Sequence, residues 1–217
     1  MSAQAKAAKP DPDREWWLRT LAVFQSPRAV FAALRNDSDE AVEARQEPVL
    51  AIALLAAMAG VLTSPSTGTL MNNPERDGLV VAVLVFLAGI IYGLAGYWIG
   101  GGVLYLGARA AGSTRSYRQA RHVLAFAAAP VALSLLVLWP VEIAVFGGDL
   151  FRTGGSDAGS AGRLVFRGIE GAFYLWSFVL LVLGVRALNR WPVVRSLGAI
   201  ALTAFALVAI ALLPSLA

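Results

Sequence analysis

The chain has 217 residues, of which 58% are hydrophobic and only 15% charged, and its mean hydropathy is +0.66. A soluble domain is about half apolar and about a quarter charged, so the composition excludes an ordinary soluble enzyme and indicates a polytopic membrane protein. Cysteine is absent and histidine occurs once, which excludes disulfides, thiolate metal sites and two-histidine zinc motifs. The net charge of +4 favours an anionic lipid surface over nucleic acid, because the arginines flank apolar stretches.

The N-terminal region separates into two parts. Residues 1–13 are rich in Ala, Lys, Asp and Pro, and we expect them to be a disordered tail. Residues 14–47 indicate amphipathic helices, because apolar residues such as Trp17 and Leu21 recur at helical spacing and Ser26, followed by proline, fits an N-cap. These helices fit two placements equally well, either on the membrane surface or packed on the protein's own cytosolic face.

Five apolar stretches of helical length follow, and they predict the fold class as an all-α, polytopic bundle of five transmembrane helices in residues 48–217. The stretches are 48–63, 79–106, 122–146, 167–187 and 196–217. The first has 16 residues, whereas a bilayer requires ~20, so a re-entrant segment is the alternative for this stretch.

The distribution of arginines predicts the orientation. With five spans, ten arginines near span ends lie on the N-terminal side and four on the other, whereas a re-entrant first stretch gives seven on each side. The ten are Arg28, Arg35, Arg45, Arg109, Arg115, Arg118, Arg121, Arg186, Arg190 and Arg195. Because cytosolic loops carry the excess of basic residues, we expect a multi-pass protein of the bacterial cell (inner, plasma) membrane, with its N-terminus in the cytosol and its C-terminus outside.

One face of the second span carries four glycines at the spacing that allows two helices to approach closely. They are Gly89, Gly93, Gly96 and Gly100. We expect this stripe to pack against the third or fourth span. A seam between two copies of the chain, and therefore a homo-oligomer, is the alternative.

The segment between the second and third spans is the densest basic patch. Its candidate residues are Arg109, Arg115, Arg118, Arg121 and His122. Ser116 and Gln119 have the spacing of a capping box at the start of a helix. The patch either binds anionic headgroups or an acidic partner, or it only flanks the spans and snorkels to the interface. His122 fits an interfacial hydrogen-bonding role better than that of a catalytic base.

Three charged residues lie in or beside apolar sequence near the outer interface, namely Glu142, Arg167 and Glu170. Charges within a membrane often indicate function, but this shallow depth favours a structural ion-pair cluster. A transport path would need a charge near mid-membrane, which the first, second and fifth spans lack. No nucleophile–base pair, nucleotide fingerprint or metal motif occurs, so we predict no enzymatic activity, no catalytic residue, no cofactor and no metal site.

The run from the end of the second span through the third has a distinct pattern. Arg109 is followed by Gly112, then by a turn rich in Ser and Tyr, and Phe126 lies four residues before Pro130. This pattern resembles the Yip1-domain family, and residues 26–31 resemble its bacterial members. The resemblance implies a polar N-terminal region, five packed helices and a cytosolic loop between the second and third.

Two departures limit what the resemblance implies. The family's Gly-Tyr before the proline is Ala125-Phe126 here, and the acidic Tyr-Gly-Pro motif of eukaryotic members, which are linked to Rab-type GTPases and vesicle traffic, is absent. GTPase binding is therefore not implied. We expect a membrane scaffold or membrane-shaping factor, with a small transporter or channel subunit as the alternative. The expected partners are the lipid bilayer with its anionic lipids and a second copy or another membrane protein, but no nucleic acid.

Overall fold

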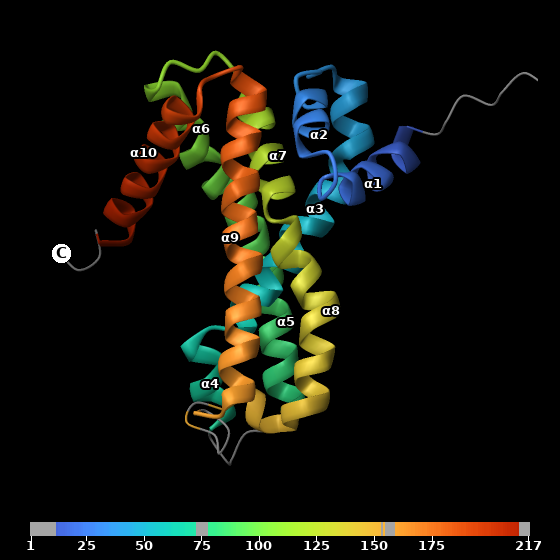
Figure 1. Cartoon of the computed structure of the whole chain (residues 1–217), viewed down its shortest axis with the longest axis vertical. Coiled ribbons are helices and arrows are strands. Elements are labelled where there is room, and N and C mark those ends of the chain that lie inside the picture. Colours follow the sequence, from blue (N-terminus) through green and yellow to red (C-terminus); the bar gives the residue numbers. More distant parts are fainter. Residues whose placement is uncertain (1–11, 73–77, 153, 155–158, 213–217) are drawn as a thin grey trace, which may run out of the picture.

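A computed structural model describes residues 12–72, 78–152, 154 and 159–212, and within this part every regular element is a helix (Figure 1). The elements are α1 (Pro12–Ala22), α2 (Pro27–Ala33), α3 (Asp39–Leu62), α4 (Pro65–Met71), α5 (Gly78–Ala95), the π-helical turn η1 (Gly96–Gly100), α6 (Gly101–Ala110), α7 (Tyr117–Ala127), α8 (Ala129–Phe146), the 3-10 turn η2 (Gly147–Phe151), α9 (Ala161–Asn189) and α10 (Val193–Leu212). Four helical stretches are long and apolar enough to cross a membrane, and α10 is a shorter apolar helix. The predicted all-α membrane bundle is confirmed, whereas most of the predicted disordered tail lies outside the described residues.

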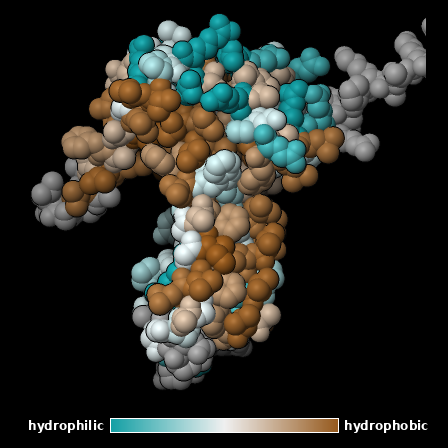
Figure 2. All heavy atoms as spheres, viewed as in Figure 1, coloured by the Kyte–Doolittle hydropathy of each residue, from teal (hydrophilic) through white to brown (hydrophobic). Residues whose placement is uncertain are grey.

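The two ends of the bundle differ in composition. The helices α3, α5, α8 and α9 run along the long axis, while α1, α2 and α7 gather at one end and α4 lies at the other (Figure 1). Figure 2 shows hydrophilic residues concentrated at the first end and apolar residues along the shaft. We call the first the arginine-rich end, comprising residues 12–45, 109–122 and 186–195, and the other the α4 end. This separation places the apolar shaft where lipid tails would surround it.

The helix α7 forms the centre of the arginine-rich end. The capping box predicted at its start is present, because Ser116 Oγ accepts from the Gln119 N–H and the Gln119 side chain accepts from the Ser116 N–H. Val123 and Phe126 are buried in a core to which α1, α2, α3 and α9 also contribute. Burial of each such side chain contributes about 1.5–3 kcal/mol, so α7 is the element on which the surrounding helices pack.

The first span differs most from its predicted bounds. The helix α3 begins at Asp39 rather than Pro48, because Ser38 caps it by accepting a hydrogen bond from the Ala41 N–H (3.3 Å). Its 24 residues extend over about 36 Å, which is enough to cross a ~30 Å hydrocarbon core and favours a full span over a re-entrant segment. Hydrophobicity alone misses this start, since the first turns are polar. The other long helices likewise extend into polar flanks beyond the predicted spans.

The two N-terminal helices occupy different environments. α2 buries Val30 and Phe31 against the bundle, so this helix packs on the protein itself. In α1, Trp16 is buried, whereas Trp17 is 42% and Leu21 65% exposed. One side of α1 therefore contacts the bundle and the other presents apolar residues outward, as an interfacial helix does.

Two glycines of the predicted stripe pack against α3. Gly89 faces Met58, and Gly93 faces Leu54 so closely that an added Cβ would lie 2.9 Å from Leu54 Cδ2 and 3.0 Å from Leu54 Cα. This contact joins the second span to the first, not to the third or fourth as predicted. The chain direction reverses between α3 and α5, which makes the two helices neighbours.

The stripe does not continue regularly toward α6. Gly100 faces Leu124 of α7, but a Cβ added at Gly96 would meet nothing within 4 Å. The π-helical turn begins at Gly96, and within this wider turn Tyr97 is the residue that points into the core. The prediction that Gly96 belongs to the packing face is therefore wrong, because it assumed an uninterrupted α-helical period.

Candidate functional site

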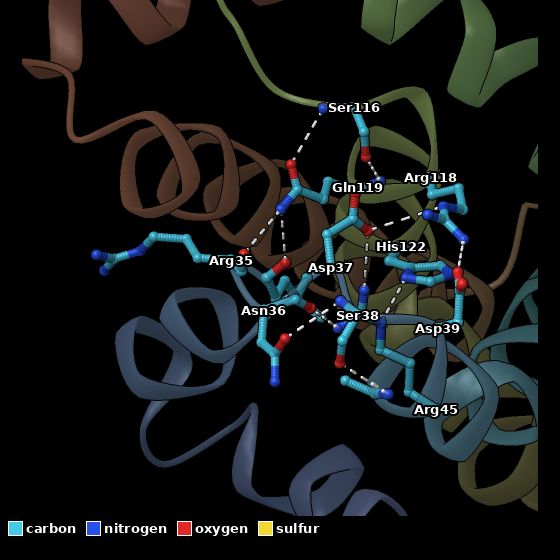
Figure 3. Close-up of polar contacts among 12 residues, drawn as sticks. Arg35, Asn36, Asp37, Ser38, Asp39, Arg45, Ser116, Arg118, Gln119 and His122 are labelled. Atoms are coloured by element: carbon cyan, nitrogen blue, oxygen red, sulfur yellow. Dashed lines mark hydrogen bonds and ion pairs between the residues drawn. The ribbon is translucent and has the colours of Figure 1, made fainter.

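Hydrogen bonds tie the turn between α2 and α3 to α7 (Figure 3). The buried Gln119 side chain donates through Nε2 to the carbonyl oxygens of Leu34 (3.1 Å) and Arg35 (3.2 Å). Its Oε1 accepts from the Ser116 N–H (3.1 Å). One side chain thus completes the cap of α7 and fixes the end of α2 beside it.

Arg45 makes a second attachment between these elements. Its fully buried guanidinium donates through Nε to His122 Nδ1 (2.7 Å) and through Nη1 to the Asn36 carbonyl (2.7 Å), and its Nη2 lies 3.5 Å from Asp37 Oδ1 (Figure 3). An Nδ1 that accepts a hydrogen bond carries no proton, so His122 is neutral in this arrangement and protonated on Nε2. Since a buried charge requires partners, these contacts hold the start of α3 against α7. We call Asp37, Arg45, Gln119 and His122 the buried clamp.

Further contacts extend the attachment to α1 and to the first turn of α3. Arg118 donates through Nη1 to Asp39 Oδ1 (2.7 Å). The Trp16 ring centroid lies 5.6 Å from the Arg45 guanidinium and 5.9 Å from the Phe126 ring centroid. Both N-terminal helices are therefore held in a defined position on the bundle.

With α2 held in this way, a hollow of about 330 Å³ lies between α2 and the end of α9. Its lining residues are Arg28, Arg35, Leu183, Arg186, Ala187, Arg190 and Trp191. We call it the arginine pocket. Within the described part of the chain, no ion pair joins any of its four arginines to a carboxylate. The pocket therefore concentrates positive charge that the protein itself leaves uncompensated.

The end of α9 determines where two of these arginines lie. Arg190 adopts a left-handed conformation (φ 58°, ψ 36°), and its N–H donates to the Arg186 carbonyl. The Trp191 N–H donates to the same carbonyl (3.2 Å). A left-handed residue is a common way to end a helix, and here it keeps Arg186 and Arg190 about one turn apart at the mouth of the pocket.

The chemistry of the arginine pocket suits a phosphate-bearing ligand. A guanidinium presents a planar set of donors that can bind phosphate oxygens in pairs. The Nε of Arg35 is buried without a hydrogen-bond partner, so it is a donor that a bound anion could satisfy. Leu183 and Ala187 add an apolar wall toward the middle of α9. This combination matches a lipid headgroup better than a free solute.

The predicted basic patch does not form one surface, because its central members are buried. Arg121 is only 6% exposed, and its guanidinium lies 4.9, 3.8 and 4.7 Å from the ring centroids of Tyr97, Trp98 and Tyr117. His122 is fully buried in the clamp. Neither side chain is placed to meet a headgroup.

The remaining members of the patch point to separate neighbours. Arg118 is paired with Asp39, whereas the Arg109 guanidinium lies 5.8 Å from the Tyr105 ring centroid. The backbone N–H of Arg115 donates to Ser113 Oγ (3.1 Å). The central members of the patch predicted from sequence are therefore engaged in structural contacts and do not form one continuous basic surface.

The arginine pocket escapes sequence analysis because its arginines also act as orientation signals. Arg28 and Arg35 lie seven residues apart, which is two helical turns, and Arg186 and Arg190 lie four apart. These spacings are the available signal, although Arg35 lies in the turn after α2 and Arg190 is the residue that caps α9. Nothing local indicates that the two faces meet.

The three charged residues that the sequence predicts near the outer interface lie together but form no ion pair with one another in the described part of the chain. Glu142, Arg167 and Glu170 line one pocket at the α4 end, yet no ion pair links them within the described residues. The nearby Arg163 donates through Nη2 to the Leu150 carbonyl (2.6 Å), and Arg167 is exposed. The predicted ion pairs are therefore not formed, although the three residues share one pocket: Arg167 remains exposed to solvent while Glu142 is buried.

Comparison with known proteins places these features in a family. Searches among curated proteins and among solved structures gave no significant match. The family model of the Yip1 domain, in contrast, matches residues 21–215, which include the buried clamp, the arginine pocket and all the long helices. Because this match covers most of the chain, the protein belongs to the Yip1 domain family.

Proposed function

We propose that this protein is a non-enzymatic membrane-organising factor that holds anionic phospholipid headgroups in its arginine pocket at the cytosolic face of the cell membrane. The observation that carries the proposal is the convergence of four arginines on one hollow. They come from two elements far apart in sequence and have no carboxylate partner within the described residues. A phosphate-bearing headgroup supplies the missing negative charge.

The position of the pocket supports this assignment. All ten arginines that predict the cytosolic side belong to elements at the arginine-rich end. The cytosolic leaflet carries anionic lipids and attracts a nearby basic residue by about 1 kcal/mol. Four arginines in one hollow would hold a single headgroup rather than a diffuse layer of lipid.

The N-terminal helices support an effect on the membrane beyond simple binding. α1 presents Trp17, Leu18 and Leu21 outward, while Trp16 attaches the helix to the bundle. An apolar helix side that enters the interface occupies headgroup area in one leaflet. Because Trp16 joins α1 to the bundle and the clamp joins the end of α2 to it, helix insertion and headgroup binding would act on the same leaflet at fixed separation.

The test uses the purified full chain and native mass spectrometry with an equimolar mixture of anionic and zwitterionic phospholipids. The double variant Arg28→Gln/Arg186→Gln removes one charge from each side of the pocket. At about 1 kcal/mol per residue, its affinity for the anionic lipid should fall about 30-fold. The zwitterionic lipid should be retained as before.

The matched control is Arg109→Gln/Arg115→Gln, which removes the same charge from the same end but outside the pocket. This variant should retain anionic lipid nearly as well as the wild type. An equal loss in both double variants would mean that only the total charge matters, and the arginine pocket would then have no specific role.

The alternative function is a small transporter or channel subunit that uses the outer charges. The observation in its favour is that the pocket at the α4 end reaches Glu142. Proton or ion flux into liposomes containing the protein, lost in Glu142→Gln, would support this alternative over the scaffold. The absence of flux in the wild type would contradict it.

A further inference from the structure

A second pocket lies at the α4 end, at the opposite end of the bundle from the arginine pocket. It has a volume of about 280 Å³ and lies where α3, α4, α8, η2 and α9 meet. Its charged lining residues are Glu142, Arg152, Arg163, Arg167 and Glu170. Two carboxylates and three guanidinium groups thus border one space, which differs in kind from the all-basic arginine pocket.

Two of these groups have unused hydrogen-bonding capacity. Glu142 is only 4% exposed, and its buried Oε1 has no hydrogen-bond partner. The Arg163 guanidinium is fixed by its bond to the Leu150 carbonyl, while its buried Nε has no partner. A buried polar atom without a partner is costly, so a ligand that offers both a donor and an acceptor would be favoured here.

Aromatic contacts, some of them with Phe146 behind the lining, fix the position of several residues that line this pocket. The Arg163 guanidinium lies 5.3 Å from the Phe146 ring centroid, and the Phe146 ring contacts Phe166 edge to face, 5.5 Å between centroids. Trp139 and Phe151 stack at 5.9 Å on another side. The charged groups therefore have defined positions before any ligand enters, which reduces the ordering cost of binding.

An apolar groove of about 300 Å³ adjoins the pocket and extends along the shaft. The two hollows share Leu62 and Phe151 in their walls, and the groove is otherwise lined mainly by apolar side chains, including Met58, Val81, Phe86 and Leu135. A polar hollow at the end of a spanning bundle, next to an apolar groove on its shaft, matches the two parts of a phospholipid. A soluble ligand would leave the groove unused.

We propose that the α4-end pocket binds a phospholipid whose zwitterionic headgroup carries a primary ammonium, as in phosphatidylethanolamine. The ammonium donates to Glu142, the phosphate accepts from Arg163, and one acyl chain lies in the adjoining groove. A phosphatidylglycerol headgroup offers no ammonium to the buried carboxylate, and a choline headgroup has no N–H to donate. This site lies apart from the arginine pocket, so neither depends on the other.

A series of lipids tests the ammonium contact without altering the protein. The purified full chain is offered phosphatidylethanolamine, its N-methyl and N,N-dimethyl derivatives, and phosphatidylcholine, all with the same acyl chains, and retention is measured by native mass spectrometry. Phosphatidylcholine should be retained about tenfold or more weakly than the N,N-dimethyl derivative. The third methyl group replaces the only remaining N–H, and a hydrogen bond to a charged group is lost with it. Equal retention of the first and last members would overturn the proposal.

Variants assign the contact to its residues. Glu142→Gln should remove the preference for phosphatidylethanolamine over phosphatidylcholine, whereas Arg163→Gln should weaken retention of both, because both carry the phosphate. Glu43→Gln, which changes an exposed carboxylate at the arginine-rich end, is the matched control and should retain the preference. A preference that persists in Glu142→Gln would contradict the assignment, and Arg163→Gln still tests the site if Glu142→Gln does not fold.

Two further measurements separate this site from its alternatives. Free phosphoethanolamine should not displace the lipid at matched concentration, because it lacks the acyl chain that occupies the groove. Displacement would mean that the pocket binds a soluble ligand, and it would overturn the lipid assignment. Arg28→Gln/Arg186→Gln should leave the phosphatidylethanolamine preference unchanged. Loss of that preference in this double variant would place the lipid in the arginine pocket instead.

Discussion

Gly93 and Gly96 form a matched pair for testing how α5 packs against α3. They lie three residues apart, but a Cβ at Gly93 would lie 3.0 Å from the backbone Cα of Leu54, whereas a Cβ at Gly96 would meet nothing within 4 Å. Carbon atoms prefer separations of about 3.5–4.0 Å, so Gly93→Ala requires α3 to move. Overpacking of this kind costs about 1–3 kcal/mol, and replacing glycine within a helix returns about 0.5–1 kcal/mol. Gly93→Ala should therefore lose about 1 kcal/mol of stability, and Gly96→Ala should lose none.

The assay is thermal unfolding of the purified full chain in mild detergent, followed by tryptophan fluorescence. A loss of 1 kcal/mol lowers the Tm of a chain of this size by about 2–4 °C, which such an assay resolves. Gly96→Ala should unfold at or slightly above the wild-type temperature. If both variants lost stability equally, or if neither did, the close approach of α5 to α3 at Gly93 would be refuted.

Three further predictions test other parts of the fold. Arg45→Met should destabilise the arginine-rich end by about 3–5 kcal/mol, because it leaves the buried partners of the guanidinium unpaired. Limited proteolysis should therefore cleave the N-terminal helices earlier than in the wild type. The control variant Arg109→Met should be cleaved at the wild-type rate. Gly184→Ala should lower the Tm, since its Cβ would lie 2.8 Å from a side-chain carbon of α7 and 2.9 Å from one of α2. A topology reporter fused after Ala111 should be active in the cytosol and one fused after Ala217 outside it, and activity on a single side would contradict five spans.

The helices of this protein are predictable because their signals are local. The start of α7 follows from Ser116 and Gln119, two side chains three residues apart that satisfy each other's backbone groups. Long apolar stretches likewise identify the membrane-crossing helices without knowledge of their neighbours. The polar first turns of α3 are the exception, since only the cap at Ser38 marks where that helix begins.

The candidate sites are less predictable because they depend on contacts between distant residues. Arg45 and His122 lie 77 positions apart, and no local pattern indicates that one donates to the other. Arg121 is enclosed partly by Tyr97 and Trp98, whose direction depends on the π-helical turn of the second span. A regular helical period cannot represent that turn, and the prediction from such a period places Gly96 on the wrong face.

The left-handed backbone of Arg190 has two opposing consequences, one for the stability of the end of α9 and one for the charge of the arginine pocket. A side chain in this conformation costs about 1–2 kcal/mol that glycine would not incur, and glycine is the usual residue at such helix ends. Among the described residues, Arg190 alone adopts a positive φ without being glycine. A glycine here would relax the end of α9 but remove one of the four charges that face the hollow. If the pocket acts as proposed, Arg190→Gly would make the end of α9 more stable and at the same time weaken the binding of anions.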